Sequence, residues 1–178
     1  KYMELKGLQR EIVGIFPADH LVQKADIFSQ ALELAEVCAR DGKVVTLGLK
    51  PTEPATGYGY IQTEKQPFNY KKQMNSYRVS KFHEKPNSQV AKEFLKAGSY
   101  YWNAGIFVFQ VEKMCEHFER LQPQIWDALS ALKLDLSNLN EIYAQMPSIS
   151  IDYAIMEHLN QDELLCVPCD PGWSDVGS

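Results

Sequence analysis

The fold is decided by residues 11–49, which read EIVGIFPADHLVQKADIFSQALELAEVCARDGKVVTLGL. The stretch begins with a short apolar run at 11–16, which is typical of a buried strand. Residues 26–40 then carry apolar side chains at helical spacing, and Asp41-Gly42 ends the pattern. Residues 43–49 form a second apolar run. Strand, helix and strand in this order predict a βαβ unit and a parallel sheet.

The rest of the chain continues to alternate between the two kinds of element. Periodicity and turn residues predict further strands at 58–62, 77–83, 102–110 and 164–167. They predict helices between 88 and 98 and at 112–120, 123–133, 139–145 and 150–159. Residues 65–76 are polar without periodicity, which indicates an exposed hairpin tip or loop. We therefore predict one α/β domain with a mixed, mainly parallel sheet.

Composition narrows the classes of partner. The chain has 178 residues, which is enough for one domain with a substantial core, and its formal net charge is −5. That charge disfavours a general nucleic-acid-binding surface. No apolar stretch is long enough to cross a membrane, and the first residues show no signal-peptide pattern. We expect a cytoplasmic protein without nucleic-acid or membrane partners, and the oligomeric state stays open.

The pair Cys166 and Cys169 has the spacing of some redox and zinc motifs. A zinc site would need a second pair of ligands at matching spacing, and the sequence has none. A thioredoxin-type motif would open a helix, whereas this pair continues an apolar run. We interpret the two residues as reduced thiols on a strand.

Several short blocks place polar side chains at the ends of apolar runs. In chain order they are Phe16-Pro17-Ala18-Asp19-His20, Gly57-Tyr58-Gly59-Tyr60-Ile61, Phe82-His83-Glu84-Lys85-Pro86, Trp102-Asn103-Ala104-Gly105-Ile106-Phe107 and Trp173-Ser174-Asp175-Val176-Gly177. In open α/β sheets, ligands bind beyond the carboxyl ends of the strands. Together the blocks predict one active site assembled from several strand ends.

Asp19 and Asp175 are the candidate metal ligands. Mg²⁺ commonly takes one or two protein carboxylates and completes its shell with water and substrate phosphates. Two aspartates that met in space would supply that number. Asp19 could instead cap the helix that follows it, and Asp175 could stabilise a turn. The sequence leaves open whether the two meet.

Two further blocks offer groups suited to a sugar phosphate. Lys85 is a compact positive charge suited to a phosphate, and the carboxylate of Glu84 can accept hydrogen bonds from hydroxyls. The amide of Asn103 offers both donors and an acceptor. The alternatives are a solvated strand end for the charged pair and a satisfied buried amide for Asn103.

The Gly57-Tyr58-Gly59 block and His20 carry weaker signals. The block lacks the third glycine and the following helix of a dinucleotide-binding fingerprint. Gly59 could let a ligand approach the backbone, and Tyr58 offers an aromatic ring to a sugar. His20 could act as a general base, but a structural hydrogen bond is the favoured role. Neither a Gly-x-Ser-x-Gly elbow nor a Cys/His constellation occurs, which disfavours a covalent hydrolase.

In this order the blocks resemble the sugar-phosphate nucleotidyltransferases, and the resemblance covers nearly the whole chain. Two blocks, Ser-Ile-Asp-Tyr-Ala-Ile-Met-Glu at 150–157 and Gly-Trp-Ser-Asp-Val-Gly-Ser at 172–178, favour the mannose/GTP branch over the glucose/thymidine branch. The resemblance implies a Rossmann-like α/β/α domain. It also implies a reaction in which mannose 1-phosphate attacks the α-phosphorus of GTP, giving GDP-mannose and pyrophosphate.

The resemblance further implies a role for each candidate residue. Asp19 and Asp175 would hold the catalytic Mg²⁺, and Lys85 would meet the sugar phosphate. The sugar would be held by Glu84, Asn103 and the backbone of Gly59, with Tyr58 beside it. Such a transfer needs an in-line approach and neutralised phosphate charge, which a bridging cation and a lysine can supply.

The chain departs from the family at both ends. A glycine-rich loop with Arg and Lys opens family members, and nothing before Glu11 resembles it. The family also continues past the position of Ser178. We expect residues 1–178 to be an incomplete nucleotidyltransferase catalytic domain that does not turn over GTP alone. Two alternatives stay open: a nucleotidyltransferase for glucose 1-phosphate with UTP or dTTP, and a non-catalytic regulatory homologue that binds a sugar nucleotide.

Overall fold

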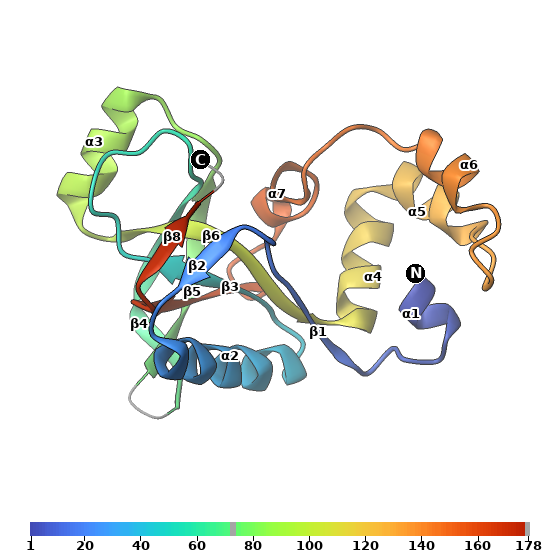
Figure 1. Cartoon of the computed structure of the whole chain (residues 1–178), viewed down its shortest axis with the longest axis horizontal. Helices are drawn as coiled ribbons and strands as arrows, with labels where there is room; N and C mark the ends of the chain where they lie inside the picture. Colours follow the sequence, from blue (N-terminus) through green and yellow to red (C-terminus); the bar gives the residue numbers. More distant parts are fainter. Residues whose placement is uncertain (72–73, 177–178) are drawn as a thin grey trace.

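A six-stranded sheet forms the centre of the structure, a computed structural model that describes residues 1–71 and 74–176. Its strands lie in the order β1 (Ile12–Ile15), β6 (Tyr100–Gln110), β3 (Val44–Leu49), β7 (Leu164–Cys169), β5 (Met74–His83) and β4 (Tyr60–Lys71). A separate two-stranded sheet pairs β2 (His20–Val22) with β8 (Trp173–Asp175). Figure 1 shows this small pair beside the larger sheet.

The large sheet is mostly antiparallel, so the prediction of a mainly parallel sheet was wrong. In the part of the chain that the structure describes, β3 and β7 form the only parallel pair of neighbouring strands. The predicted strand, helix and strand of the βαβ unit exist, but β6 is inserted between β1 and β3 and runs antiparallel to both. Such an insertion by a distant strand cannot be read from local order, because a buried antiparallel strand is as apolar as a parallel one.

Helices cover both faces of the sheet and give the predicted α/β/α class. Alternate residues of β3 and β7 point to opposite faces, so the core divides into two clusters. The cluster on one face contains the buried side of α2 (Ala25–Arg40), which runs along the sheet in Figure 1. The cluster on the other face contains residues of α4 (Val111–Leu121), α7 (Ile151–Ala154) and the 3-10 helix η1 (Met156–His158).

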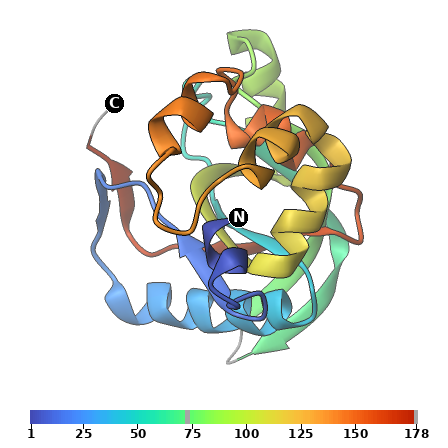
Figure 2. The same cartoon turned by 90° about the vertical axis from the view of Figure 1, so that its right-hand side faces the viewer.

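The remaining helices lie at the two ends of the molecule. At one end α1 (Tyr2–Leu5), α5 (Pro123–Ser130) and α6 (Leu139–Ala144) gather near α4 (Figure 2). At the other end α3 (Ser88–Ala97) begins at the N-cap Asn87 and ends at Gly98, whose φ of 66° is left-handed. Within the described ranges, no helix combines the length and the apolar character needed to cross a bilayer.

Several predicted boundaries differ from the structure. The helix predicted at 150–159 is two short pieces, α7 and η1, because Ile155 leaves the helical backbone conformation. The helix predicted at 123–133 ends at Ser130. The polar segment 65–76 is largely strand, because β4 and β5 pair with each other over this segment as a hairpin. Phe68 and Met74 within it pack against the core, and Ser76 is buried. Residues 72–73, within that segment, and residues 177–178, from the last sequence block, lie outside the described part.

Candidate active site

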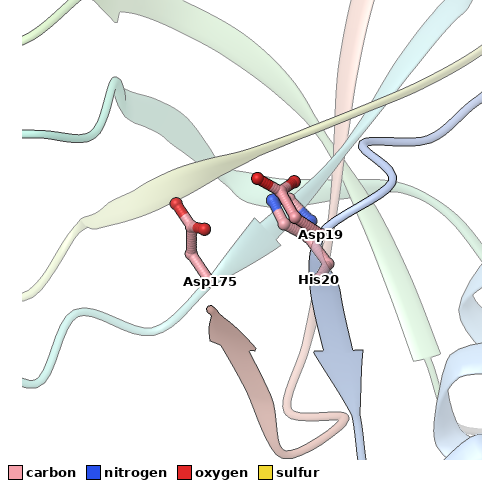
Figure 3. Close-up of side chains that lie close together, drawn as sticks. All are labelled: Asp19, His20 and Asp175. Atoms are coloured by element: carbon pink, nitrogen blue, oxygen red, sulfur yellow. The ribbon is translucent and has the colours of Figure 1, made fainter. Parts of the chain in front are cut away.

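The two candidate aspartates, from opposite ends of the chain, lie side by side. Strands β2 and β8 pair antiparallel with His20 directly opposite Asp175, and the Val176 N–H donates to the Asp19 carbonyl at 3.1 Å. One potential ligand atom from each of Asp19, His20 and Asp175 lies within 4.8 Å of the others. Figure 3 shows the three side chains at the adjacent ends of β2 and β8. These three residues are the candidate metal ligands that the structure assembles.

The helix-capping alternative for Asp19 does not fit this geometry. The N-cap of α2 is Lys24, so Asp19 does not cap the helix that follows it. Asp19 is exposed in the turn that precedes β2. Asp175 is the last residue of β8 and is half-buried. Backbone pairing between β2 and β8 therefore brings the two aspartates together.

A cavity of about 170 Å³ opens beside these ligands and gathers most of the other predicted site residues. Its lining includes Tyr58, Gly59, Glu84, Asn103 and Asp175, together with His20, Asp152 and Trp173. Asp19 and Lys85 are not part of the lining. The blocks recognised in the sequence therefore converge, although two of the predicted residues stand outside the cavity itself.

Asn103 reaches the cavity because β6 bulges at this point. Thr46 of β3 faces Phe107, whereas Gly48, two residues further along β3, faces Asn103 four residues back on β6. Gly105 adopts a φ of 65° inside the bulge, a conformation that glycine takes without strain. Bulges of this kind redirect side chains next to active sites.

The side-chain amide of Asn103 is held by a network of hydrogen bonds. Its Oδ1 accepts from the Thr46 hydroxyl at 3.0 Å and from the Gly105 N–H at 3.1 Å. Its Nδ2 donates to Asp152 Oδ1 at 3.0 Å, and its backbone N–H donates to the Gly59 carbonyl at 2.8 Å. The oxygen thus has two donors already, so Asn103 can offer a ligand the second hydrogen of Nδ2 rather than an acceptor.

Glu84 is buried against the backbone of Gly59. Its side chain is only 9% exposed, and a Cβ at position 59 would lie 2.6 Å from Glu84 Oε2. Burial raises the pKa of the Glu84 carboxyl, and the charge of Asp152 raises it further. Glycine at this position is therefore required for the carboxylate to sit where it does.

Lys85 is exposed next to this buried carboxylate. Its Nζ lies 3.6 Å from Glu84 Oε1, and its side chain is 62% exposed. Its backbone has a φ of 43°, an uncommon conformation for a residue with a Cβ. The two charged residues are thus not an equivalent solvated pair, because one is buried and the other is accessible to a ligand.

Asp152 was missed as a site residue, although its block was recognised. It lies in the first turn of α7, where the Ser150 hydroxyl accepts from the Tyr153 N–H, and the sequence indicated only this helix start. Burial raises the pKa of the Asp152 carboxyl, and the charge of Glu157 also raises it. The hydrogen bond from Asn103 lowers this pKa but does not offset the effect of burial. The available signal was its place five residues before Glu157 in a block rich in apolar residues.

Aromatic rings form another wall of the site. Trp173 contacts His20 edge-on, with ring centroids 5.0 Å apart, and its Nε1–H donates to His20 Nδ1 at 3.0 Å. Tyr58 lies between Trp173 and the buried Trp102, with centroid distances of 5.5 Å and 5.2 Å. Trp173 was recognised only as a neighbour of Asp175. The hydrogen bond gives His20 the structural role that the sequence favoured.

The cysteine pair lies outside this site. Cys166 and Cys169 are free and buried on β7. Burial raises the pKa of the Cys166 thiol, and raises that of Cys169 to about 12. Protonated thiols are poor metal ligands and poor nucleophiles, which supports their interpretation as strand residues.

Comparisons with known proteins identify relatives that match nearly the whole chain. Residues 2–178 match the family model described as Nucleotidyl transferase. The chain is 37% identical over 183 residues to a mannose-1-phosphate guanylyltransferase of Salmonella montevideo, and 37% identical over 171 residues to one of Escherichia coli K12. It superimposes with a TM-score of 0.84 and 38% identity on a Thermus thermophilus structure described as a mannose-1-phosphate geranyltransferase.

These matches cover nearly all of this chain but less than half of each relative. The alignments include 98% and 92% of the chain against 38% and 35% of the Salmonella and Escherichia proteins. The structural match includes 99% of the chain and 49% of the Thermus protein.

Proposed function

The chain belongs to the nucleotidyl transferase family, and from this premise we propose that its protein transfers GMP from GTP to mannose 1-phosphate. The products are GDP-mannose and pyrophosphate. The observation that carries the proposal is the meeting of Asp19 and Asp175 beside a cavity that also contains Glu84 and Asn103. The names of two relatives that are 37% identical support the choice of substrates.

The chemistry of the donor atoms fits a divalent cation at Asp19 and Asp175. Carboxylate oxygens are the ligands preferred by Mg²⁺, which takes one or two of them and keeps other positions for water and phosphates. The described acidic groups Asp19 and Asp175 supply that number, with Asp19 exposed. When bound, the cation would neutralise phosphate charge in the transition state. We propose Mg²⁺ as the physiological ion.

The remaining residues of the site would bind and orient the sugar phosphate. In the reaction, a phosphate oxygen of mannose 1-phosphate forms a bond to the α-phosphorus of GTP, and the bond to the departing pyrophosphate breaks. Lys85, exposed beside the cavity, would attract the sugar phosphate. Glu84 would accept hydrogen bonds from sugar hydroxyls, and Asn103 would donate one. Gly59 would allow the sugar to approach the backbone, with Tyr58 beside it.

We also propose that residues 1–178 carry the cation and sugar half of a larger catalytic domain. The coverage of 38% and 35% of the relatives' lengths supports this proposal. On this view the isolated chain binds mannose 1-phosphate but does not turn over GTP. Production of GDP-mannose by the 178-residue chain would contradict the half-domain proposal without affecting the choice of substrate.

Calorimetry on the isolated chain with Mg²⁺ tests the substrate. We expect mannose 1-phosphate to bind and glucose 1-phosphate to compete poorly. Glu84→Gln should weaken the binding, whereas Glu93→Gln, a matched change on α3, should not. A pyrophosphate-release assay on a protein of the relatives' length that contains this chain tests the reaction. Activity with glucose 1-phosphate and UTP or dTTP, and none with mannose 1-phosphate and GTP, would overturn the proposal.

A further inference from the structure

Trp173 holds one neighbour of the proposed cation site, His20, in a single tautomer. The indole Nε1–H donates to His20 Nδ1 at 3.0 Å, and the two ring planes stand 86° apart. An indole nitrogen can only donate, so the accepting Nδ1 must be unprotonated. Neutral His20 therefore carries its hydrogen on Nε2.

In this tautomer neither nitrogen of His20 is ready to bind a metal. Coordination through Nδ1 would replace the hydrogen bond from Trp173 and leave the indole N–H without its acceptor. Coordination through Nε2 would move the hydrogen to Nδ1, where it would face the indole N–H. By contrast, Asp19 and Asp175 offer carboxylate oxygens within the same 4.8 Å cluster. Of the three candidate ligands in this cluster, the hydrogen bond removes the one that offers nitrogen.

The position of the indole ring is fixed from several sides. Trp173 is paired in β8 opposite Val22, and the Gln23 N–H donates to the carbonyl of the preceding Gly172 at 3.3 Å. Its ring packs edge-on against Tyr58, which in turn packs against the buried Trp102. The ring therefore cannot turn away from His20 without disturbing these contacts.

We propose that Trp173 determines which cation the site accepts. By engaging His20 Nδ1 it leaves an all-oxygen pair, which suits the hard cations Mg²⁺ and Mn²⁺. With a free imidazole the same three residues would form an Asp/His/Asp set suited to Zn²⁺. The inference rests on the proposed function, which places the cation at Asp19 and Asp175.

The first test measures the tautomer in the protein without any metal. Long-range ¹H–¹⁵N correlation spectra of the 178-residue chain, recorded where histidine is neutral, report which ring nitrogen carries the hydrogen. We expect His20 to carry it on Nε2, and its signals to be assigned by their loss in His20→Asn. A hydrogen on Nδ1 would overturn the proposal. This result does not depend on catalysis or on the folding of any Trp173 variant.

The second test compares Mn²⁺ and Zn²⁺ binding to the chain by calorimetry. Trp173→Phe keeps a ring but removes the N–H. It should raise Zn²⁺ affinity on the order of tenfold, which is the size of the change in metal affinity when a hydrogen-bond partner of a ligating histidine is mutated. Mn²⁺ affinity should stay nearly unchanged. The gain should disappear when His20→Asn is added, and His20→Asn alone should change neither affinity.

Two outcomes separate this inference from the proposed function. If Asp175→Asn and His20→Asn weaken Mn²⁺ binding to the same extent, the histidine is a ligand and only the inference fails. If Asp175→Asn leaves Mn²⁺ binding unchanged, the proposed cation site fails, and the selectivity fails with it. An unchanged Zn²⁺ affinity in a folded Trp173→Phe variant would also overturn the inference.

Discussion

On one side of the cavity, Asp19 and Asp175 lie at the ends of β2 and β8, two strands of three residues each. On the other side, Glu84, Asn103 and Asp152 belong to a polar wall whose hydrogen-bonded network is anchored in the six-stranded sheet. The first wall presents carboxylates near the surface. The second holds polar groups that are largely withdrawn from water.

The difference teaches how stability and function divide between the two walls. An exposed carboxylate contributes little to the free energy of unfolding, so a substitution there should change stability little whatever it does to activity. A buried amide with several hydrogen bonds contributes to both, because its removal leaves its partners unsatisfied. Substitutions in the first wall should therefore reduce activity with little effect on stability, whereas substitutions in the second wall should reduce stability.

The largest expected effect comes from Asp19→Asn in the first wall. We expect the GMP-transfer rate of a protein of the relatives' length to fall about 100-fold or more, the scale of a lost transition-state electrostatic contact. The free energy of unfolding should change by less than about 0.5 kcal/mol, because the side chain is exposed. Steady-state kinetics and urea denaturation measure the two quantities.

The control for this variant is Asp127→Asn, the same change on an exposed residue of α5. It should affect neither the transfer rate nor the stability. A nearly unchanged rate in Asp19→Asn would favour the non-catalytic regulatory homologue over the enzyme.

Asn103→Ala tests the second wall and should mainly reduce stability. It removes the acceptor of the Thr46 hydroxyl, which is fully buried, and the donor to Asp152. We expect the free energy of unfolding to fall by about 2 kcal/mol, the scale of unsatisfied buried polar groups. Asn140→Ala, an exposed change on α6, should cost far less. Equal losses in urea denaturation would mean that the network does not hold the wall together.

Gly59→Ala sharpens the comparison by moving one carboxylate without removing it. The new Cβ would lie 2.6 Å from Glu84 Oε2, so the side chain must shift. We expect the affinity for mannose 1-phosphate to fall about tenfold, or ~1.4 kcal/mol. Gly57→Ala is the matched control, because it adds a methyl group to the same cavity lining but no protein atom lies within 4 Å of a Cβ there, so Glu84 need not move. Calorimetric titrations in which both variants bind equally would disprove the requirement for close approach.

The smallest expected effect is on the pH dependence of stability. Burial raises the pKa of both Asp152 and Glu84, so the folded protein holds these protons more tightly than the unfolded chain. Their contribution to stability is complete below the unfolded carboxyl pKa and is lost as pH rises through the raised folded value. Asp152→Asn should therefore flatten the decline of stability over this range.

Urea denaturation at a series of pH values checks this prediction. The Asp127→Asn variant supplies the reference profile, because it makes the same Asp-to-Asn change as Asp152→Asn at an exposed position. A wild-type stability that rises across the same range relative to Asp152→Asn would show that the sign is wrong.

Local pattern predicted most elements of the fold. The strands near 11–16 and 43–49 and the helix at 26–40 appear as β1, β3 and α2 within a residue or two at each end. The stop at Gly98 was also confirmed, because only a glycine-like residue adopts the left-handed conformation there without strain. The short strands β2 and β8 were not predicted, since three residues carry no periodicity.

Most of the candidate site residues could also be selected from local sequence pattern. Polar residues at the ends of apolar runs mark strand ends, so Asp19, Glu84, Asn103 and Asp175 could be selected one at a time. Asp152 could not, because a serine-capped helix start explains an aspartate in the first turn equally well. The tautomer of His20 needed the coordinates of Trp173, which lies 153 positions away.

The sequence by itself determined the kinds of element, their order, and the polar groups that end them, because these follow from the spacing of side chains along one segment. Only the tertiary structure decided that β6 enters between β1 and β3, that β2 pairs with β8, and that Asn103 turns into the cavity. Strand pairing and register depend on how the whole chain buries its apolar faces and satisfies its backbone. No single segment carries that information.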